Sequence, residues 1–258
     1  MSRAALVTGG GTGIGAAIAD RLTGDGYGVC ITGRRREPLD TVAAETGALA
    51  VPGDTGDPAA VESAVAAAKE AFGRLDVLVC NAGIGLGGTI EEQTPDGWDA
   101  VLRTNLTGAF LACRAAVPEL VKTKGSVVTI SSDSGLRAAP RSAAYCAAKA
   151  GLVMLTQCIA LDYGPLGVRA NCICPGWVRT PMADEEMDEL AALRGTDREG
   201  AYDLVASPVP LRRPAGPEEI ASAVAWLASD EASFLTGAVV AVDGGNTVVD
   251  ASATVFAS

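Results

Sequence analysis

The chain has 258 residues, 48% of them hydrophobic and 20% charged, which supplies a sizeable core and excludes a disordered chain. The 31 acidic residues outnumber the 20 basic ones, so the net charge is −11. This excess of negative charge disfavours nucleic acid or an anionic membrane surface as a partner. The absence of histidine excludes a histidine-based triad, general base or metal ligand, and we expect no metal site.

Seven cysteines are scattered through apolar stretches, and none forms a CxxC pair. This pattern favours buried, reduced thiols in a cytoplasmic protein. The first glycine-rich loop begins at Gly9, which leaves no room for a signal peptide before it. No apolar stretch approaches about 20 uncharged residues, so we expect no membrane span.

Short apolar runs alternate with segments of helix length from end to end. Because most of the runs are continuously apolar, they predict strands that are buried on both faces. The alternation predicts one α/β domain over residues 1–258, with a doubly wound, mostly parallel seven-stranded sheet covered by helices on both faces. The predicted strands are residues 4–8, 28–32, 48–51, 77–80, 126–130, 169–174 and 238–242, and the predicted helices are residues 13–25, 37–46, 58–72, 95–122, 143–163 and 217–229.

Residues 182–210 interrupt this alternation with an acidic, helix-prone stretch before the last predicted helix. Connections of this length inside a compact domain usually form lids or binding loops, so we expect a substrate lid here. A pair of surface helices with no role at the site is the alternative.

The first predicted strand leads into the loop Thr8-Gly9-Gly10-Gly11-Thr12-Gly13-Ile14-Gly15, which opens the first predicted helix. Glycine permits a tight turn and lets the backbone approach a pyrophosphate, whose charge then faces the positive end of the helix. Methyltransferases and ordinary turns also contain such loops. A strand before the loop and a helix after it favour a dinucleotide site.

The end of the second predicted strand helps to distinguish NAD from NADP, because an acidic residue there binds the ribose hydroxyls of NAD. The chain has Arg34-Arg35-Arg36 near this place and no acid at the strand tip. An arginine can clamp a 2′-phosphate, so NADP(H) is favoured and NAD(H) is the alternative. The three arginines also fit a solvated run at the start of a helix, and at least one of them must belong to it.

Two further polar positions follow later strands at the same edge of the sheet. Asp54 either accepts a hydrogen bond from the adenine amino group or caps a turn or helix ahead of Pro58. Asn81-Ala82-Gly83 follows the fourth strand, at the edge where ligands bind in such folds. Asn81 either contacts the cofactor or braces the sheet.

Tyr145 and Lys149 are four residues apart at the start of a predicted helix and project from the same face. A free tyrosine has a pKa of about 10, and a nearby ammonium favours the phenolate and lowers that pKa. In a chain without histidine, this pair is the strongest candidate for acid–base chemistry.

Two more polar residues complete the constellation. Ser132 closes the fifth predicted strand, 13 positions before Tyr145. Its hydroxyl either donates to a substrate carbonyl oxygen as negative charge develops or bonds its own backbone in a turn. Asn105 lies within a predicted helix, where a buried amide needs partners, and a helix kink or a water relay toward Lys149 would supply them.

These motifs, in this order and at this spacing, resemble those of the short-chain dehydrogenase/reductase family, in its shorter branch. The resemblance extends from Leu6 to Gly245. It rests on residues 8–15 as TGxxxGxG, 81–83 as NAG, Asn105, Ser132, 145–149 as YxxxK and 175–180 as PGxxxT.

The resemblance implies a Rossmann-type fold and an oxidoreductase that interconverts a ketone and a secondary alcohol by hydride transfer. Tyr145 would be the acid and base, and Lys149 would lower its pKa and hold the nicotinamide ribose. Ser132 would orient the carbonyl, and Asn105 would support a proton relay. The residues implied at the cofactor are Gly9, Gly13, Ile14, Gly15, Arg34, Asp54, Asn81, Ala82, Gly83, Tyr145, Lys149, Pro175, Gly176, Val178 and Thr180.

One family marker is absent, because Thr12 stands where NADP-preferring members carry a second basic residue. A regulator that binds the dinucleotide without turnover is a rival class, and a degenerate Tyr, Lys or Ser would indicate it. All three are intact here. A nucleotide-sugar epimerase or dehydratase would need a larger C-terminal domain and a different glycine loop.

The expected small-molecule substrate is a neutral ketone or secondary alcohol of moderate size, because the acidic outer face of residues 184–189 disfavours a highly anionic one. The family implies a homotetramer, or a dimer, formed by the helices at 95–122 and 143–163 and by the last strand. The apolar tail residues Val248, Val249, Val255 and Phe256 would reach across such an interface. The predicted pocket residues are Ile84, Leu86, Ser134, Leu136 and Trp177, with Met182, Met187, Leu190, Leu193, Tyr202 and Leu204 from the lid.

Overall fold

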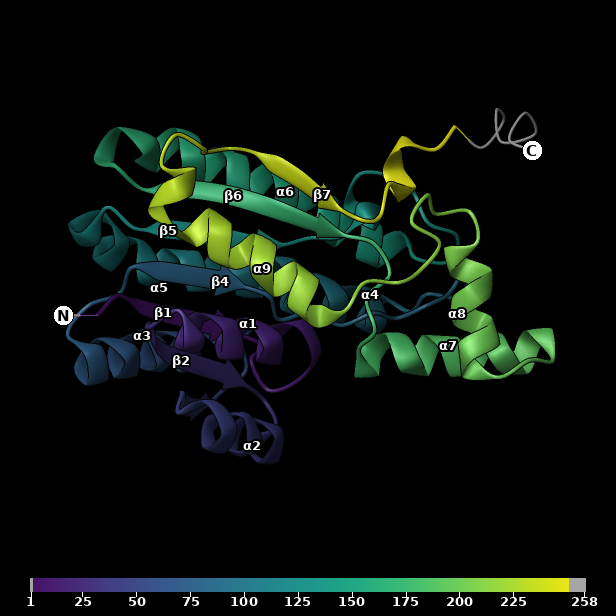
Figure 1. Ribbon diagram of the computed structural model, residues 1–258, viewed down its shortest axis with the longest axis horizontal. Helices are drawn as coiled ribbons and strands as arrows, with labels where there is room; N and C mark the ends of the chain where they lie inside the picture. The colour runs from purple at the N-terminus through teal and green to yellow at the C-terminus, as the bar shows by residue number, and fades with distance from the viewer. Residues whose placement is uncertain (1, 251–258) are drawn as a thin grey trace.

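A computed structural model describes residues 2–250 of the chain. Seven strands pair in parallel in the order β3-β2-β1-β4-β5-β6-β7, which confirms the doubly wound sheet (Figure 1). The tail residues Val255 and Phe256 lie outside the described residues. The strands are β1 (Ala4–Thr8), β2 (Gly28–Gly33), β3 (Leu49–Pro52), β4 (Val77–Cys80), β5 (Ser126–Ile130), β6 (Arg169–Pro175) and β7 (Val239–Val242).

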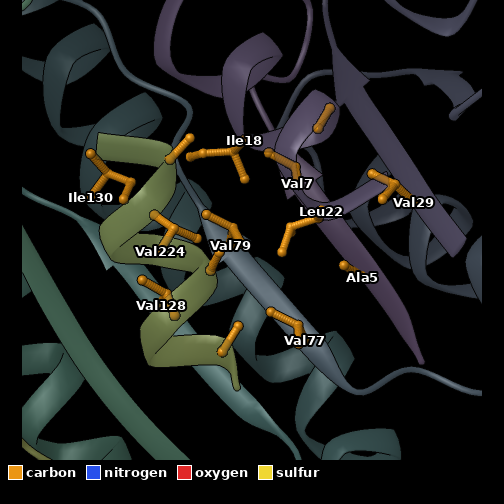
Figure 2. Packing of buried hydrophobic residues seen from close by; sticks show 14 of the residues in the cluster. Ala5, Val7, Ile18, Leu22, Val29, Val77, Val79, Val128, Ile130 and Val224 are labelled. Atoms are coloured by element: carbon orange, nitrogen blue, oxygen red, sulfur yellow. The ribbon is translucent and has the colours of Figure 1, made fainter. Parts of the chain in front are cut away.

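Alternate residues of the central strands point to opposite faces of the sheet, and both faces are buried. On one face, Val7 of β1 packs with Ile18 of α1 (Gly13–Gly24) and Val224 of α9 (Pro217–Ala228), as Figure 2 shows. On the other face, Leu6 of β1 joins a second cluster. Its helices are α3 (Pro58–Phe72), α5 (Gly108–Thr123) and α6 (Ala143–Tyr163), while α2 (Arg36–Thr46) covers the first face beside β2.

The helix ends follow local rules of the sequence. The carboxylate of Asp57 accepts a hydrogen bond from the Ala59 N–H at 3.0 Å, and Pro58 occupies the first turn of α3. The same helix stops at Gly73, whose φ of 75° is a left-handed conformation that glycine adopts at little cost. These signals at the helix ends set the lengths of the helices and of the loops that connect them to the strands. The strand ends therefore lie along one edge of the sheet.

The segment predicted as one helix over 95–122 is helical throughout, but it is not one regular α-helix. It consists of α4 (Pro95–Leu102), a π-helical turn (Arg103–Thr107) and α5. Asn105 lies within the π turn and is 1% exposed, and its amide bonds the backbone of Ile84. A π turn inserts an extra residue and so turns this side chain toward the sheet edge, which helical periodicity alone does not reveal.

The region predicted as a lid forms two helices, α7 (Pro181–Arg194) and α8 (Arg198–Ala206), which stand beyond the carboxyl ends of the strands (Figure 1). By length and composition alone, the helical stretch Ala143–Leu166 could cross a membrane. Within the fold, one side of α6 packs on the sheet through the buried Leu152, Thr156 and Ile159, while Met154 and Leu161 are exposed.

Candidate active site

The loop between β1 and α1 can fold this tightly only because it is rich in glycine. Gly9 has a φ of 66°, and a Cβ added to Gly15 would lie 2.1 Å from the carbonyl oxygen of Gly9. Thr12 precedes α1 and makes no side-chain hydrogen bond to its first turn. The loop therefore presents bare backbone and the N–H groups of a helix start, which is the geometry that pyrophosphate prefers.

The loop after β6 meets the glycine loop from the other half of the sheet. A Cβ added to Gly13 would lie 3.1 Å from Cγ2 of Thr180. Thr180 itself begins α7 and accepts a hydrogen bond from the Ala183 N–H at 3.2 Å. Pro175 ends β6, and Val178 forms an isolated parallel bridge with Ala215. The structure thus brings the first and last predicted cofactor motifs together.

Asn81 braces the edge of the sheet, which is one of the two alternatives that the sequence leaves open for it. Its amide Nδ2 donates to the carbonyl oxygens of Thr8 at 3.0 Å and Gly9 at 3.1 Å. The Thr8 hydroxyl in turn accepts from the N–H groups of Asn81 and Ala82. These bonds fix the end of β4 to the glycine loop and hold the predicted cofactor segments in register.

Arg34 and Asp54 lie after β2 and β3, at the adenosine end of the expected site. Arg34, Arg35 and Arg36 are all exposed, and Arg36 begins α2, so this arginine belongs to the helix. Asp54 accepts from the Gly56 N–H at 2.9 Å, which makes it a turn residue. Within the described part of the chain, Arg34 forms no salt bridge and its guanidinium is available to an anion.

Tyr145 and Lys149 project from one face of α6, as predicted. The Lys149 ammonium lies 5.4 Å from the centroid of the Tyr145 ring and donates to the carbonyl oxygen of Ile130 at 2.8 Å. Burial lowers the pKa of Lys149 to about 8. Burial likewise raises the pKa of Tyr145 to about 12, against a smaller lowering by a hydrogen bond with Ser132. The expected lowering of this pKa by Lys149 is not found: burial of the phenol dominates, and the Lys149 ammonium donates to Ile130 instead.

Ser132 lies two residues after the end of β5 and contributes to the pKa of Tyr145 through its hydroxyl. That hydroxyl donates to Asp133 Oδ1 at 3.0 Å and accepts from the Ser134 N–H at 3.1 Å. Asp133 also accepts from Asn246 Nδ2 at 2.8 Å. The Ser132 hydroxyl thus bonds within a turn, as one of the two alternatives expects, and also lies within hydrogen-bond reach of Tyr145. Its role at a substrate carbonyl stays a prediction.

Asn105 approaches Lys149 from the π turn. Its amide exchanges two hydrogen bonds with Ile84, at 2.8 Å to the N–H and 2.9 Å from the carbonyl. A Cβ added to Gly83 would lie 3.5 Å from both Asn105 Oδ1 and Lys149 Nζ. The Asn105 amide clamps the loop after β4 beside the Lys149 ammonium, and it makes no direct bond to Lys149.

Several predicted pocket residues pack inside the lid rather than line a cavity. Met187 and Tyr202 are at most 1% exposed and form a cluster with Ala183, Ala191 and Ala201. Trp177, Leu190 and Val205 pack against that cluster. Met182, Leu193 and Leu204 are exposed, as is Leu86 on the loop after β4.

Sequence reasoning missed two carboxylates that face Tyr145. Asp133 and Glu186 both raise the pKa of the phenol by their charge. Glu185, Glu186, Asp188 and Glu189 are exposed, as expected of the outer face of this stretch. The Glu186 carboxylate also reaches the loop after β4, where a Cβ on Gly85 would lie 3.6 Å from its Oε1. No sequence motif identifies Asp133 or Glu186 as a neighbour of the site. The position of Glu186 depends on how α7 is rotated about its axis relative to the edge of the sheet.

Comparison with known proteins agrees with this geometry. Residues 9–247 match the family model described as enoyl-(acyl carrier protein) reductase. The chain is 42% identical to Protein MoaE of Klebsiella aerogenes over 259 residues, with 100% of each chain covered. It is 38% identical to meso-2,3-butanediol dehydrogenase of Serratia marcescens, with 96% of each chain covered. Actinorhodin polyketide ketoreductase with NADPH has a TM-score of 0.92 at 34% identity, over 96% of this chain and 98% of that chain.

The chain belongs to the short-chain dehydrogenase/reductase family of oxidoreductases. The match extends along nearly the whole chain, and the parallel sheet is that of its solved relatives.

Proposed function

We propose that this protein is an NADP(H)-dependent oxidoreductase that interconverts a neutral ketone and its secondary alcohol, with Tyr145 as the proton donor and acceptor. The observation that carries the proposal is the cluster at the carboxyl edge of the sheet, where the Tyr145 phenol meets the Ser132 hydroxyl beside the Lys149 ammonium. A butanediol dehydrogenase and a ketoreductase among the relatives support chemistry at a carbinol carbon.

The residues present fit a nicotinamide dinucleotide, which supplies or accepts the hydride when bound. Bare backbone at the glycine loop and the uncapped start of α1 suit its pyrophosphate. The motif residues that would hold it are Gly9, Gly13, Ile14, Gly15, Asn81, Ala82, Gly83, Pro175, Gly176, Val178 and Thr180, with Asp54 at the adenine.

Tyr145 and Ser132 act on the same substrate atom, the carbonyl oxygen, while Lys149 and Asn105 act on the cofactor and on the loop beside it. In the reductive direction, Tyr145 donates its proton to the carbonyl oxygen, and the raised pKa keeps the phenol protonated at neutral pH. Ser132 donates a hydrogen bond to the same oxygen as negative charge develops there. Lys149 would hold the nicotinamide ribose, and Asn105 would keep the loop beside it in place for a proton relay.

The preference for NADP(H) rests on Arg34. Its guanidinium is exposed at the end of β2 with no acidic side chain at the strand tip, so it can pair with a 2′-phosphate. An NAD(H)-dependent enzyme is the alternative, and it would leave this arginine in water.

We further propose a homotetramer in the cytoplasm, with α7 and α8 as the substrate lid. Exposed apolar side chains occur on α5 and α6 and again near the edge strand β7, which gives two separate faces for association. All seven cysteines are free thiols, which suits a reducing compartment.

The proposed chemistry is tested with Tyr145→Phe. Wild-type protein should consume NADPH when ketones are added, and the variant should lose activity by about a thousandfold or more, because proton transfer to the carbonyl oxygen contributes on that order. Cofactor affinity, followed by NADPH fluorescence, should change less than about threefold. A variant that keeps most of its turnover would show that another group donates the proton.

A further inference from the structure

The carboxylate of Asp133 joins the Ser132 hydroxyl to the segment that follows the last strand. Its Oδ1 accepts a hydrogen bond from the Ser132 hydroxyl at 3.0 Å, and its Oδ2 accepts one from the Asn246 amide at 2.8 Å. Both Asp133 and Asn246 are partly buried. Asn246 therefore reaches Ser132 through a single intervening side chain, although it lies 113 positions along the chain from Asp133.

The turn after β7 holds Asn246 in this place. The Asp243 carboxylate accepts from the N–H groups of Gly245 at 2.9 Å and Thr247 at 2.7 Å, on either side of Asn246. Gly245 has a φ of 92°, a left-handed value that favours glycine. A Cβ added to Gly245 would lie 2.8 Å from Pro210, so the turn also rests against the end of residues 182–210. The backbone of Asn246 is thus fixed on both sides.

At its other end, the link reaches a turn that packs against α6. The Ser132 oxygen accepts from the Ser134 N–H at 3.1 Å, while its own proton is directed to Asp133. A Cβ added to Gly135 in the same turn would lie 3.0 Å from the carbonyl oxygen of Lys149. The turn therefore has no room to shift toward α6, and the orientation of the Ser132 side chain depends on its own hydrogen bonds.

A serine hydroxyl carries one proton, so Ser132 cannot donate to Asp133 and to a substrate oxygen at the same time. The proton can pass from one acceptor to the other by rotation about the Cβ–Oγ bond, without movement of the oxygen. Asp133 sets the orientation of the Ser132 side chain before a substrate binds. The carboxylate of Asp133 is itself oriented by the donor on its far oxygen, which is Asn246.

We propose that Asn246 is a positioning residue for Ser132: through Asp133, it holds the serine side chain in the orientation from which the hydroxyl turns to a substrate carbonyl. The inference rests on the proposed function for the role of Ser132. Asn246 takes no part in the bonds that form and break. Its loss should therefore lower kcat and leave cofactor binding unchanged, since a small misplacement of a catalytic group slows the reaction.

Asn246→Asp keeps the shape of the side chain and removes the donor. At pH 8 its carboxylate and that of Asp133 are both ionised and repel each other, so the link breaks. With NADPH, kcat for acetoin and cyclohexanone should fall by at least about tenfold. The affinity for NADPH, followed by fluorescence, should stay within about threefold. Asn246→Leu, which removes the donor without adding a charge, should show the same loss.

The double exchange Asp133→Asn with Asn246→Asp tests whether the link itself is what matters. It reverses donor and acceptor, because the amide oxygen at position 133 accepts from Ser132 while the amide N–H donates to the carboxylate at position 246. It should restore kcat to within about threefold of the wild type. A role in stability alone would lower the melting temperature of the single variants and leave kcat of the folded protein unchanged. That result, or a double exchange as slow as Asn246→Asp, would overturn the inference.

Tyr145→Phe separates this inference from the proposed function. If the wild type reduces neither ketone, or if Tyr145→Phe keeps its turnover, the proposed reaction fails and the role of Asn246 in it fails as well. If Tyr145→Phe is inactive while Asn246→Asp and Asn246→Leu match the wild type, the proposed reaction stands and the inference alone is refuted.

Discussion

Lys149 illustrates how a single functional residue acts against stability. Its side chain is 4% exposed, and burial lowers the pKa of its ammonium to about 8 from a usual value of 10.5. At neutral pH the amine is charged in both the folded and the unfolded chain, so the folded state bears the cost of burying that charge. The hydrogen bond to Ile130 offsets only part of it.

Lys149→Met should therefore stabilise the protein while it abolishes activity. We expect the free energy of unfolding at pH 7 to rise by about 1–2 kcal/mol, since roughly 3 kcal/mol of charge burial is relieved and one hydrogen bond is lost. Between pH 8 and 10.5 the unfolded chain holds this proton more tightly than the folded one, so wild-type stability gains with pH there. The advantage of the variant should shrink over that range.

Urea denaturation of both proteins at pH 7 and pH 10 measures this difference, with Lys122→Met, an exposed lysine on α5, as the control. A variant that is less stable than the wild type at pH 7 would show that the Ile130 hydrogen bond outweighs the buried charge.

At the scale of elements, α6 carries the site on one side and an apolar surface on the other. Lys149, Leu152 and Thr156 face the sheet, while Met154 and Leu161 are 59% and 77% exposed. Phe110 of α5 is 47% exposed. Large apolar side chains on two neighbouring helices are typical of an interface, which accounts for the membrane-like composition of α6.

Leu161→Glu should disrupt that interface, because it places a charge in an apolar contact. Light scattering after gel filtration should give four chain masses for the wild type and at most two for the variant. Leu193→Glu, the same change at an exposed residue of the lid, should leave the assembly intact. A monomeric wild type would refute the proposed tetramer and leave the apolar face of α6 unexplained.

Across the whole molecule, the sequence predicts the structure best where an element depends only on the residues within it and at its ends. The bounds of β1, β4 and β5 are predicted to the residue, because continuous apolar runs end there at turn-forming or polar residues. The motif residues come together at one sheet edge for the same reason, since parallel strands share the direction of their carboxyl ends.

The remaining features depend on contacts between distant segments. The π turn at Arg103–Thr107 accompanies the bonds between Asn105 and Ile84, which are 21 residues apart. The approach of the Glu186 carboxylate to the loop after β4 depends on how α7 lies over that loop. The link from Ser132 through Asp133 to Asn246 joins residues more than 110 positions apart, and no local pattern predicts it.

The proposed preference for NADP(H) is tested by a fluorescence titration of the purified protein with NADPH and with NADH. We predict that NADPH binds at least about tenfold more tightly, through charge-assisted bonds from Arg34 to the 2′-phosphate. Arg34→Ala should remove most of that difference, whereas Arg36→Ala, in the first turn of α2, should retain it. Equal or tighter binding of NADH by the wild type would contradict the account and assign Arg34 to the solvated start of the helix.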